Sequence, residues 1–383
     1  ALPISAGKTE NATRRLEVPE CLRAPLVELA RHKQPDQLLF TNGPTVPSRQ
    51  HFWGKLRLFC RRAHVPLVCP HSLRGLHSSL AVAAGCTSGV VASRRNPGVR
   101  IVVTGAQGQL GTDLRRVLQQ HQVTGLDLPG FDLTRQDCSK AIVDAAPEIV
   151  IHAGAHTDVD GAERAPALAM AVNADGTERV ARAAAQAGAR LIYVSTDYVF
   201  DGTGTRPYLE TDSTNPAGVY GASKCAGEQR ALSCCENTLV VRTAWLYGLQ
   251  GKNFVKTILQ LAAERPSLRV VADQRGCPTY AEDLAGMISK LVAHPARGIL
   301  HVTNDGHCTW HEFATEIVRL AGYRVPVEPI TTADMPRPAK RPAYSVLSAE
   351  RLHQLGFTMP SWQDGLQRFM HALSATSPLP SRA

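Results

Sequence analysis

The stretch Ile101-Val102-Val103-Thr104-Gly105-Ala106-Gln107-Gly108-Gln109-Leu110-Gly111 passes from a short apolar run into three glycines spaced three residues apart. Glycine allows the backbone to turn tightly and to approach a pyrophosphate, which binds at a helix N-terminus because free N–H groups point at it there. The stretch therefore predicts a strand, a glycine-rich turn and a helix that bind a dinucleotide. Residues 123–126 predict a second strand ending at Asp127, at about the ~20-residue offset of a ribose-binding acid.

Strand-like and helix-like segments alternate after this turn. Residues 148–155 and 190–194 are apolar and strand-like, and the alanine-rich segment 165–187 between them favours a helix. This alternation predicts an α/β fold with a parallel, doubly wound sheet of the Rossmann type, which binds ligands beyond the carboxyl ends of its strands. We assign residues 100–242 to this NAD(P)-binding domain.

The pattern changes after residue 243 to helical patches and short strands, which predicts a smaller mixed α/β lobe that caps a substrate. We assign residues 243–373 to this lobe, partly interleaved with the first domain. The Pro/Ser-rich segment 374–383 is expected to be a disordered tail. The helical patches are residues 254–263, 282–292 and 310–321, and the short strands are residues 269–271 and 299–302.

Tyr220 and Lys224 lie four residues apart, a spacing that places both side chains on one face of a helix. A free tyrosine titrates near pH ~10, and a cation beside it lowers that pKa toward the range of a general acid. Thr196, at the end of the strand-like run 190–194, can converge with Tyr220. With the glycine turn, these residues predict hydride chemistry on a nicotinamide cofactor. The alternatives are a chance pair on a solvated helix and, for Thr196, a turn or cap residue.

Ordered blocks between residue 101 and about residue 372 resemble the dTDP-4-dehydrorhamnose reductase family of extended short-chain dehydrogenases. The resemblance implies reduction of the C4 keto group of dTDP-4-dehydro-L-rhamnose to dTDP-L-rhamnose with NADPH or NADH, for cell-surface polysaccharide. The blocks are Gly105 to Gly111, Ala155-His156-Thr157-Asp158-Val159-Asp160, Ser195-Thr196-Asp197-Tyr198-Val199-Phe200-Asp201-Gly202, Val219 to Lys224 with Gly227-Glu228, Arg242-Thr243-Ala244-Trp245-Leu246-Tyr247-Gly248, Gly251-Lys252-Asn253-Phe254, Asp273-Gln274-Arg275-Gly276-Cys277-Pro278-Thr279 and Arg341-Pro342-Ala343-Tyr344-Ser345-Val346-Leu347.

The resemblance also implies roles for single residues. Thr196 would hydrogen-bond the sugar C4 oxygen, Tyr220 would protonate it, and Lys224 would hold the nicotinamide ribose and tune Tyr220. A buried core residue is the alternative for Trp245, and a surface cation is the alternative for Arg341. The implied substrate contacts are Thr196, Asp197, Val199, Trp245, Asn253 and Arg341, of which Asn253 and Arg341 would contact the nucleotide diphosphate region. The implied cofactor contacts are Gly105, Gln107, Gly108, Gln109, Leu110, Gly111, Asp127, Asp132, Leu133, Ala153, Gly154, Ala155, Thr157, Tyr220 and Lys224.

Two residues near the predicted cofactor site depart from the family pattern. His152 stands where the family more often has asparagine, and Gly154 replaces a usual alanine, so we expect altered affinity without loss of proton transfer. Asp127 would repel a 2′-phosphate and favour NADH, yet members of the family accept NADPH as well. The preference between the two dinucleotides therefore stays open.

Three other functions are alternatives to the reductase. A sugar-nucleotide dehydratase has an Asp-Glu pair after the threonine, whereas Asp197-Tyr198 follows Thr196 here. A regulatory subunit similar to the β subunit of methionine adenosyltransferase binds a dinucleotide without a known need for turnover, and retention of Thr196, Tyr220 and Lys224 together disfavours it. The third is a DNA-binding module led by the basic N-terminus.

The N-terminal quarter differs in charge from the rest: residues 1–99 contain 14 Lys/Arg and 5 Asp/Glu, whereas residues 100–383 contain 28 of each. Two blocks resemble the catalytic domain of tyrosine recombinases, namely Gly7-Lys8-Thr9 leading to Arg14-Arg15-Leu16-Glu17-Val18-Pro19, and His71-Ser72-Leu73-Arg74-Gly75. Residues 1–99 contain no tyrosine, and this excludes strand cleavage, which needs a tyrosine nucleophile. We interpret residues 1–95 as a truncated, mainly α-helical recombinase remnant and residues 96–99 as a Pro/Gly junction. Weak DNA binding through the cations stays open but disfavoured.

The ten cysteines show no C-x-x-C spacing, so neither a zinc site nor a disulfide framework is indicated. We interpret them as reduced thiols of a cytoplasmic protein, and no run of residues is apolar and long enough to cross a membrane. No His/Asp/Glu cluster has ligand spacing. Metal use therefore stays unassigned, although some members of the resembled family bind Mg²⁺ at the contact of a homodimer.

Overall fold

The computed structural model of the chain describes residues 2–5, 13–16 and 98–376. Within the first two segments, β1 (Leu2–Ser5) and β2 (Thr13–Leu16) pair antiparallel, with Leu2 opposite Leu16. Residues from Gly98 onward form a separate compact unit. The second recombinase-like block, the helices expected in residues 17–95 and junction residues 96–97 lie outside the described residues.

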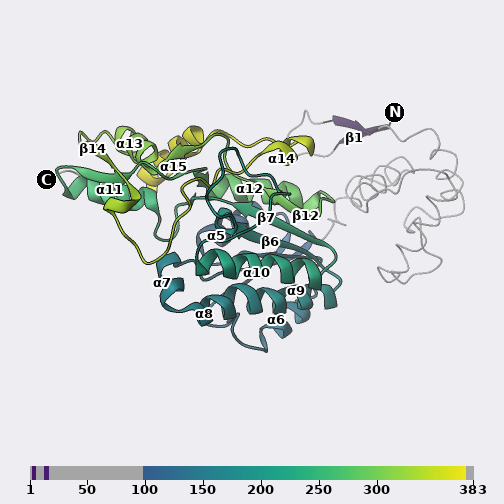
Figure 1. Cartoon of the computed structure of the whole chain (residues 1–383). Helices are drawn as coiled ribbons and strands as arrows, with labels where there is room; N and C mark the ends of the chain where they lie inside the picture. Colours follow the sequence, from purple (N-terminus) through teal and green to yellow (C-terminus); the bar gives the residue numbers. More distant parts are fainter. Residues whose placement is uncertain (1, 6–12, 17–97, 377–383) are drawn as a thin grey trace, which may run out of the picture. The chain divides into compact units, whose positions relative to one another are not determined.

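A six-stranded parallel sheet is the centre of the unit that begins at Gly98 (Figure 1). The chain places β4 on one side of β3 and then β5 on the other side, so the strand order reverses between β3 and β5. Such a reversal opens a ligand-binding crevice at the carboxyl ends of the strands. The predicted Rossmann-type, doubly wound α/β sheet is thereby confirmed. In spatial order the strands are β12 (Gly298–His301), β7 (Thr238–Thr243), β6 (Arg190–Thr196), β5 (Ile149–His152), β3 (Arg100–Thr104) and β4 (Gln122–Leu126).

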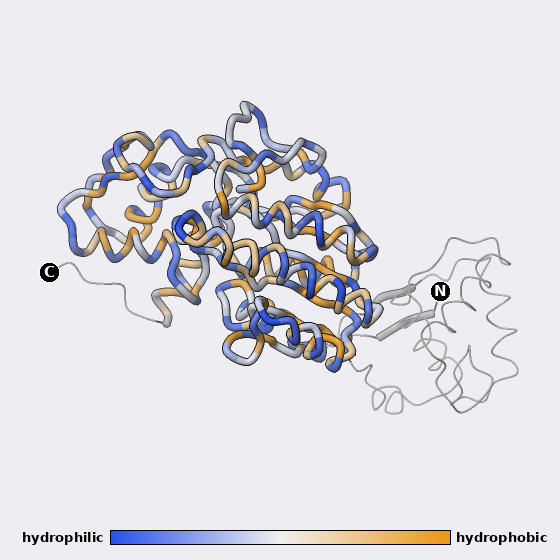
Figure 2. The backbone as a smooth tube through the Cα atoms, turned by 60° about the horizontal axis from the view of Figure 1, so that its bottom comes forward, coloured by the Kyte–Doolittle hydropathy of each residue, from blue (hydrophilic) through white to orange (hydrophobic). Residues whose placement is uncertain are grey.

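Helices cover both faces of this sheet, which explains why its inner strands are apolar on both faces. Ile101 and Val103 of β3 pack into the cluster that contains α5 and α12, whereas Val102 packs on the other face with α6 and α9. Figure 1 shows α9 and α10 on the opposite side of the sheet from α12. Hydrophobic and hydrophilic residues alternate around the helices (Figure 2), as expected for helices with one buried side. The helices are α5 (Gln109–Val117), α12 (Ala281–Ala293), α6 (Cys138–Asp144), α9 (Thr177–Gln186) and α10 (Val219–Cys234).

The C-terminal lobe, at the left of Figure 1, packs around an aromatic core. Tyr247 lies 5.5 Å from Phe313 and 5.3 Å from Phe369 between ring centroids. The lobe contains α11 (Phe254–Glu264), α13 (Trp310–Leu320), α15 (Trp362–Thr376), and the parallel pair β9 (Leu268–Val271) and β14 (Val327–Ile330). The short elements of the unit are α7 (Val159–Arg164), α8 (Pro166–Met170), a π-helical turn (Ala171–Gly176), 3-10 turns (Asp197–Val199 and Thr332–Asp334), α14 (Glu350–Gln354), β8 (Leu246–Tyr247), β10 (Arg275–Gly276), β11 (Thr279–Tyr280) and β13 (Cys308–Thr309).

Three expectations about the C-terminal part are corrected by the structure. The strand expected at residues 299–302 was assigned to the lobe, but β12 pairs with β7 as the sixth strand of the main sheet, because Leu300 is buried beside Leu239 and Val241. The helix expected at residues 282–292 was assigned to the lobe as well, but α12 packs with α5 on one face of the main sheet. A disordered tail was expected from residue 374, but residues 374–376 belong to α15. Ser374 continues α15, where its hydroxyl donates to the Met370 carbonyl oxygen, and the helix ends at Thr376. Residues 377–383 lie outside the described part.

A buried ion pair joins β7 to α10. Arg242 donates from Nε and Nη2 to the two carboxylate oxygens of Glu228, at 2.8 and 2.6 Å. The two side chains are only 2% and 4% exposed. Removal of one member of such a pair leaves an uncompensated charge in a low-dielectric interior. This ion pair therefore ties the helix that carries Tyr220 to the sheet.

We expect Glu228→Ala to lower the free energy of unfolding by about 3–5 kcal/mol, because the Arg242 guanidinium stays buried without its partner. Urea unfolding measures the effect. The control is Asp144→Ala, which breaks the exposed pair with Lys140 on α6 and should change stability by less than about 0.5 kcal/mol. Equal losses of stability in the two variants would show that the buried ion pair contributes no more than the exposed one.

Candidate active site

The glycine-rich turn forms a cradle in which Gly105 and Gly111 leave no room for a side chain. Gly105 has a φ of +67°, and a Cβ there would lie 2.7 Å from the Gly154 backbone. A Cβ on Gly111 would lie 2.0 Å from the Gly105 carbonyl oxygen. Helix α5 begins with Gly108 as its N-cap, without a side-chain cap and without an acidic residue in its first turn. The open N-terminus fits a dinucleotide pyrophosphate, because its N–H groups and dipole favour an anion.

Asp127 follows β4 and lies beside the same turn. Its carboxylate accepts the Gln107 N–H at 2.7 Å and the Leu128 N–H at 2.8 Å. Gln107, Asp127 and Leu128 all line one cavity with the glycines. The carboxylate thus stands where the sequence predicted a group for the ribose hydroxyls, and it also holds the glycine turn against β4.

A cavity of about 780 Å³ brings most of the predicted site residues together. From the cofactor set it is lined by Gly105, Gln107, Gly108, Gln109, Leu110, Gly111, Asp127, Asp132, Leu133, Ala153, Gly154, Ala155, Thr157, Tyr220 and Lys224, and from the substrate set by Thr196, Asp197 and Trp245. The sequence reasoning missed further lining residues, among them Leu128, Val172, Ser195, Tyr198, Lys252 and Trp310.

Three residues predicted to contact substrate do not line this cavity. Val199 is fully buried. Asn253 caps α11 by accepting the Lys256 N–H, and it donates to the Gly248 carbonyl oxygen at 2.7 Å. Arg341 forms a bidentate ion pair with the two carboxylate oxygens of Asp160, at 3.0 and 2.9 Å. Substrate contacts of these three residues remain predictions.

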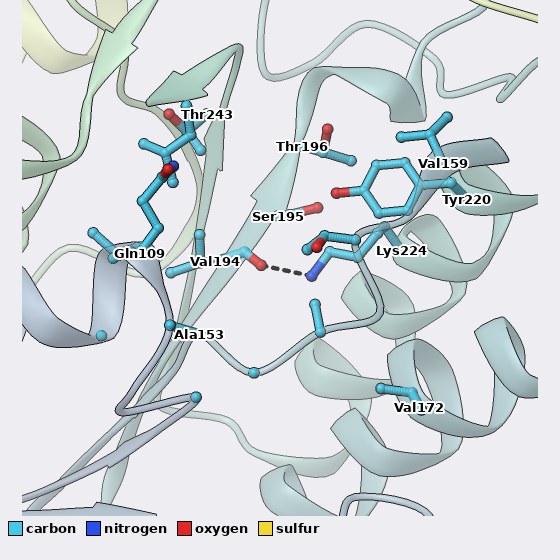
Figure 3. Close-up of a pocket in the computed structure, with 18 of the residues that line it drawn as sticks. Gln109, Ala153, Val159, Val172, Val194, Ser195, Thr196, Tyr220, Lys224 and Thr243 are labelled. Carbon is cyan, nitrogen blue, oxygen red and sulfur yellow. Dashed lines mark hydrogen bonds between the residues drawn. The ribbon is translucent and has the colours of Figure 1, made fainter. Parts of the chain in front are cut away.

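Tyr220 and Lys224 both point inward from α10 but toward different partners (Figure 3). The Tyr220 hydroxyl is directed toward Thr196 and Ser195 at the end of β6. Lys224 donates to the Val194 carbonyl oxygen at 2.7 Å, and its amine lies 4.2 Å from the centre of the Tyr193 ring. The phenol and the amine therefore share one cavity with the carboxyl end of β6.

Burial opposes the expected effect of Lys224 on the pKa of Tyr220. Burial raises the pKa of Tyr220 to about 12, against the opposing effect of a hydrogen bond with Thr196. Burial also lowers the pKa of Lys224 to about 7. The amine donates its hydrogen bond to the Val194 carbonyl oxygen and not to the phenol. Burial therefore decides the pKa values of both Tyr220 and Lys224. Tyr220 consequently keeps its proton at neutral pH, which is the form a proton donor needs.

Thr196 serves the site and the local backbone together. Its hydroxyl donates to Asp197 at 3.0 Å and accepts the Tyr198 N–H at 3.2 Å, so it caps the 3-10 turn after β6. The reading of Thr196 as a cap residue is therefore correct, and the same residue also lines the cavity. Burial raises the pKa of Asp197 to about 6, which leaves a weakly acidic carboxyl group next to Thr196.

Asn173, which no motif singled out, positions α10. It lies in the π-helical turn Ala171–Gly176, within the segment that the sequence identified only as alanine-rich helix. Its amide accepts the His156 N–H at 2.8 Å and donates to the His156 carbonyl oxygen at 3.0 Å. It also donates to Ser223, next to Lys224, at 3.0 Å. A π-helical turn often marks a functional site, and here it lets one amide join two walls of the cavity.

His152, the departure from the family pattern, is a buried neutral imidazole below the glycine cradle. Its ring hydrogen-bonds Thr104 at 2.6 Å and Thr177 at 3.0 Å, and it stacks on Tyr193. Burial lowers the pKa of His152 to about 3, with a further decrease from the charge of Lys224. The histidine therefore adds no charge to the cofactor site.

Trp245 forms part of the cavity wall in a strained backbone conformation, with φ at +46°. One face of its indole stacks on Trp310, with ring centroids 3.5 Å apart and planes at 6°. Gly276 also lies against the indole, and a Cβ there would approach it to 2.5 Å. Sequence reasoning found Trp245 but not Trp310, which reaches it only through folding of the lobe.

The fold and the site together define an NAD(P)-dependent oxidoreductase of the short-chain dehydrogenase type. The sequence model described as RmlD substrate binding domain matches residues 99–375. The chain belongs to this RmlD family.

Named relatives agree with this family. The dTDP-4-dehydrorhamnose reductase of Sinorhizobium fredii is 39% identical over 289 residues, covering 72% of this chain and 98% of the relative. The spore coat polysaccharide biosynthesis protein SpsK of Bacillus subtilis is 38% identical over 279 residues, with the same coverage of 72% and 98%. A crystal structure of dTDP-4-dehydrorhamnose reductase from Bacillus anthracis in complex with NADP superposes with a TM-score of 0.70, at 42% identity, covering 72% of this chain and 99% of that one. The family model begins at residue 99, so it gives no support to the recombinase resemblance of residues 1–95.

No three His, Cys, Asp or Glu side chains in residues 98–376 or the two short N-terminal strands come together as metal ligands. None of the helices in these described segments is long and apolar enough to cross a bilayer.

We expect Gly111→Ala to weaken NADPH and NADH binding at least about tenfold, because the new methyl group meets the Gly105 backbone at the start of α5. Dinucleotide fluorescence titration measures the affinity. Gly286→Ala on α12 is the matched control, since no atom lies within 4 Å of the added methyl group there. Equal affinity of the intact chain and Gly111→Ala would show that the cradle does not hold the dinucleotide.

The lowered pKa of Lys224 predicts a pH-dependent stability. Below about pH 7 the ammonium is buried in the folded chain at a cost. Between pH 7 and the usual lysine value of 10.5 only the unfolded chain keeps this proton, so the cost disappears as the pH rises. The intact chain should therefore gain stability relative to Lys224→Met between pH 7 and about pH 9.5.

Urea unfolding at the two pH values measures this difference. Lys290→Met, which removes an exposed lysine from α12, should keep a constant difference from the intact chain. A constant difference for Lys224→Met as well would contradict the lowered pKa.

Proposed function

We propose that the chain is an NAD(P)H-dependent reductase that converts dTDP-4-dehydro-L-rhamnose to dTDP-L-rhamnose. The observation that carries the proposal is that Thr196, Tyr220 and Lys224 line the same cavity as the glycine cradle. The names of the relatives supply the substrate. The Bacillus subtilis relative, named for spore coat polysaccharide biosynthesis, supports a role of the product in surface polysaccharide.

The chain's own residues handle the proton and the oxygen in this reaction. The bound dinucleotide supplies the hydride that reduces the C4 carbon. Tyr220, which burial keeps protonated, donates its phenolic proton to the C4 oxygen as negative charge develops there. Thr196, toward which the Tyr220 hydroxyl points (Figure 3), can donate a hydrogen bond to the same oxygen once its hydroxyl group turns away from Asp197. The two hydroxyl groups thus hold the keto oxygen at the end of β6.

Lys224 acts after the proton has left Tyr220. Its amine shares the cavity with the phenol, and its pKa of about 7 lets it gain a proton near neutral pH. A phenolate formed at Tyr220 favours the charged amine, and the charged amine in turn stabilises the phenolate. We infer that the tyrosine and lysine titrate as a coupled pair during turnover.

The dinucleotide-binding regulatory subunit is the main competing function. It requires the glycine cradle, but it does not require a phenol that points toward Thr196 inside the same cavity (Figure 3). The convergence of these groups therefore favours a reductase. The DNA-binding alternative depends on residues 6–12 and 17–95, which lie outside the described residues.

We expect Tyr220→Phe to lower kcat/KM by about 10²- to 10⁴-fold, the usual contribution of a general acid. The measurement is loss of the reduced nicotinamide absorbance in the presence of dTDP-4-dehydro-L-rhamnose. Dinucleotide affinity should change little, because the ring remains. Tyr323→Phe, which removes a phenol outside the cavity lining, should keep full activity.

Two outcomes would oppose the proposal. Full activity of Tyr220→Phe would assign the proton to another group. An intact chain that binds the dinucleotide but does not reduce the sugar nucleotide would favour the regulatory subunit.

A further inference from the structure

A sugar-nucleotide substrate brings a negatively charged diphosphate into the cavity, but Asn253 and Arg341, the residues expected to contact it, do not line this cavity. Among the described residues, the cations that line the cavity are Lys224 and Lys252. Lys224 is buried and donates to the Val194 carbonyl oxygen. Lys252 is exposed, and within the described part of the chain its side chain has no hydrogen bond or ion pair. Lys252 is therefore the lining cation whose charge is available to a ligand.

The residues that the family resemblance assigned to the diphosphate are occupied elsewhere. Arg341 is held by both oxygens of Asp160, and Arg337 lies near the same carboxylate. The hydrogen bond from Arg341, the largest cause, lowers the pKa of Asp160 to about 2 despite the opposing effect of burial. The charge of Arg341 is thus compensated by an ionised carboxylate. The Asn253 amide is likewise used as a helix cap.

The loop that carries Lys252 is held in place from both sides. Lys256 donates to the carbonyl oxygens of Leu249 and Gly251 at 2.6 and 3.1 Å. Asn253 donates to Gln109, the first residue of α5, at 3.2 Å. These contacts place Lys252 at the rim of the cavity next to the first turn of α11, which contains no acidic residue. A positioned ammonium favours an anion, and the first turn of α11 carries no acidic residue that would compete for it.

The wall beside this cation belongs to the substrate lobe. Trp245 and Trp310, which also line the cavity, form an apolar indole stack. An apolar wall raises the strength of a nearby charge interaction because it excludes water. The dinucleotide pyrophosphate, in contrast, has its own place at the glycine cradle and the N-terminus of α5.

We propose that Lys252 binds the diphosphate of the sugar nucleotide and thereby sets the affinity for the substrate. This inference rests on the proposed function for the nature of the ligand. The dinucleotide carries a diphosphate as well, so titrations with dTDP and with NADPH are needed to distinguish the two ligands. Lys252 forms no bond with the reacting sugar carbon, so its loss should act on KM and leave kcat nearly unchanged.

The test compares the full-length chain with Lys252→Met and Lys252→Arg by calorimetric titration of dTDP, thymidine and NADPH. We expect dTDP to bind about tenfold more weakly to Lys252→Met, a loss of ~1.4 kcal/mol, with NADPH affinity unchanged. Thymidine, which lacks the diphosphate, should bind equally to all three proteins. Lys252→Arg should retain dTDP affinity because it keeps the positive charge. Lys290→Met is the matched control, since it removes one exposed cation from α12, outside the cavity lining.

Kinetics and salt dependence give a second readout. KM for the sugar nucleotide should rise about tenfold in Lys252→Met at nearly constant kcat, and the affinity for dTDP should depend less on salt than in the intact chain. The proposal is overturned if dTDP binds equally to the intact chain and Lys252→Met, or if NADPH is the ligand that is lost. An intact chain that binds dTDP through Lys252 but reduces no keto sugar would reject the proposed function and leave this assignment standing.

Discussion

Close backbone contact between the ends of β3 and β5 and the start of α5 is the constraint on which the site depends. The turn at Gly105 approaches both Gly154 and Gly111 at distances that exclude a side chain. This contact directs the N-terminus of α5 into the crevice where the strand order reverses. The same reversal places the carboxyl end of β6, with Thr196, in the opposite wall of one cavity. The anion site and the proton-transfer site are therefore two consequences of a single packing arrangement.

Burial decides the charge states inside this cavity. It raises the pKa of Tyr220 to about 12 and lowers that of Lys224 to about 7. It also lowers the pKa of His152 to about 3. These shifts have a common cause, since a low-dielectric environment disfavours whichever form is charged. The cavity thus holds a protonated phenol, the imidazole below the glycine cradle is neutral, and Lys224 and Asp197 are the groups whose pKa values lie near neutral pH.

The alignment of Tyr220 depends on how α10 is anchored. The buried ion pair between Glu228 and Arg242 fixes the middle of the helix to β7, and Asn173 holds Ser223 and the His156 backbone together. These polar contacts are directional, whereas apolar packing alone tolerates small rotations of a helix. Proton transfer requires hydrogen-bond reach. The polar anchors therefore serve the chemistry as well as the stability of the fold.

The sequence by itself determined the alternating strands and helices, the glycine cradle, and the convergence of Thr196 with Tyr220 and Lys224, because these depend on local spacing and on the edge at which parallel strands end. It placed β12 in the wrong domain and misjudged the pKa of Tyr220, because strand pairing and burial depend on distant parts of the chain. Trp310 and Lys252 reach the cavity only when the lobe folds against the sheet domain. The pairing of Arg341 with Asp160 likewise joins segments far apart in the chain. Tertiary structure alone decided which cation was left for a ligand, since a charge is available only where no nearer partner compensates it.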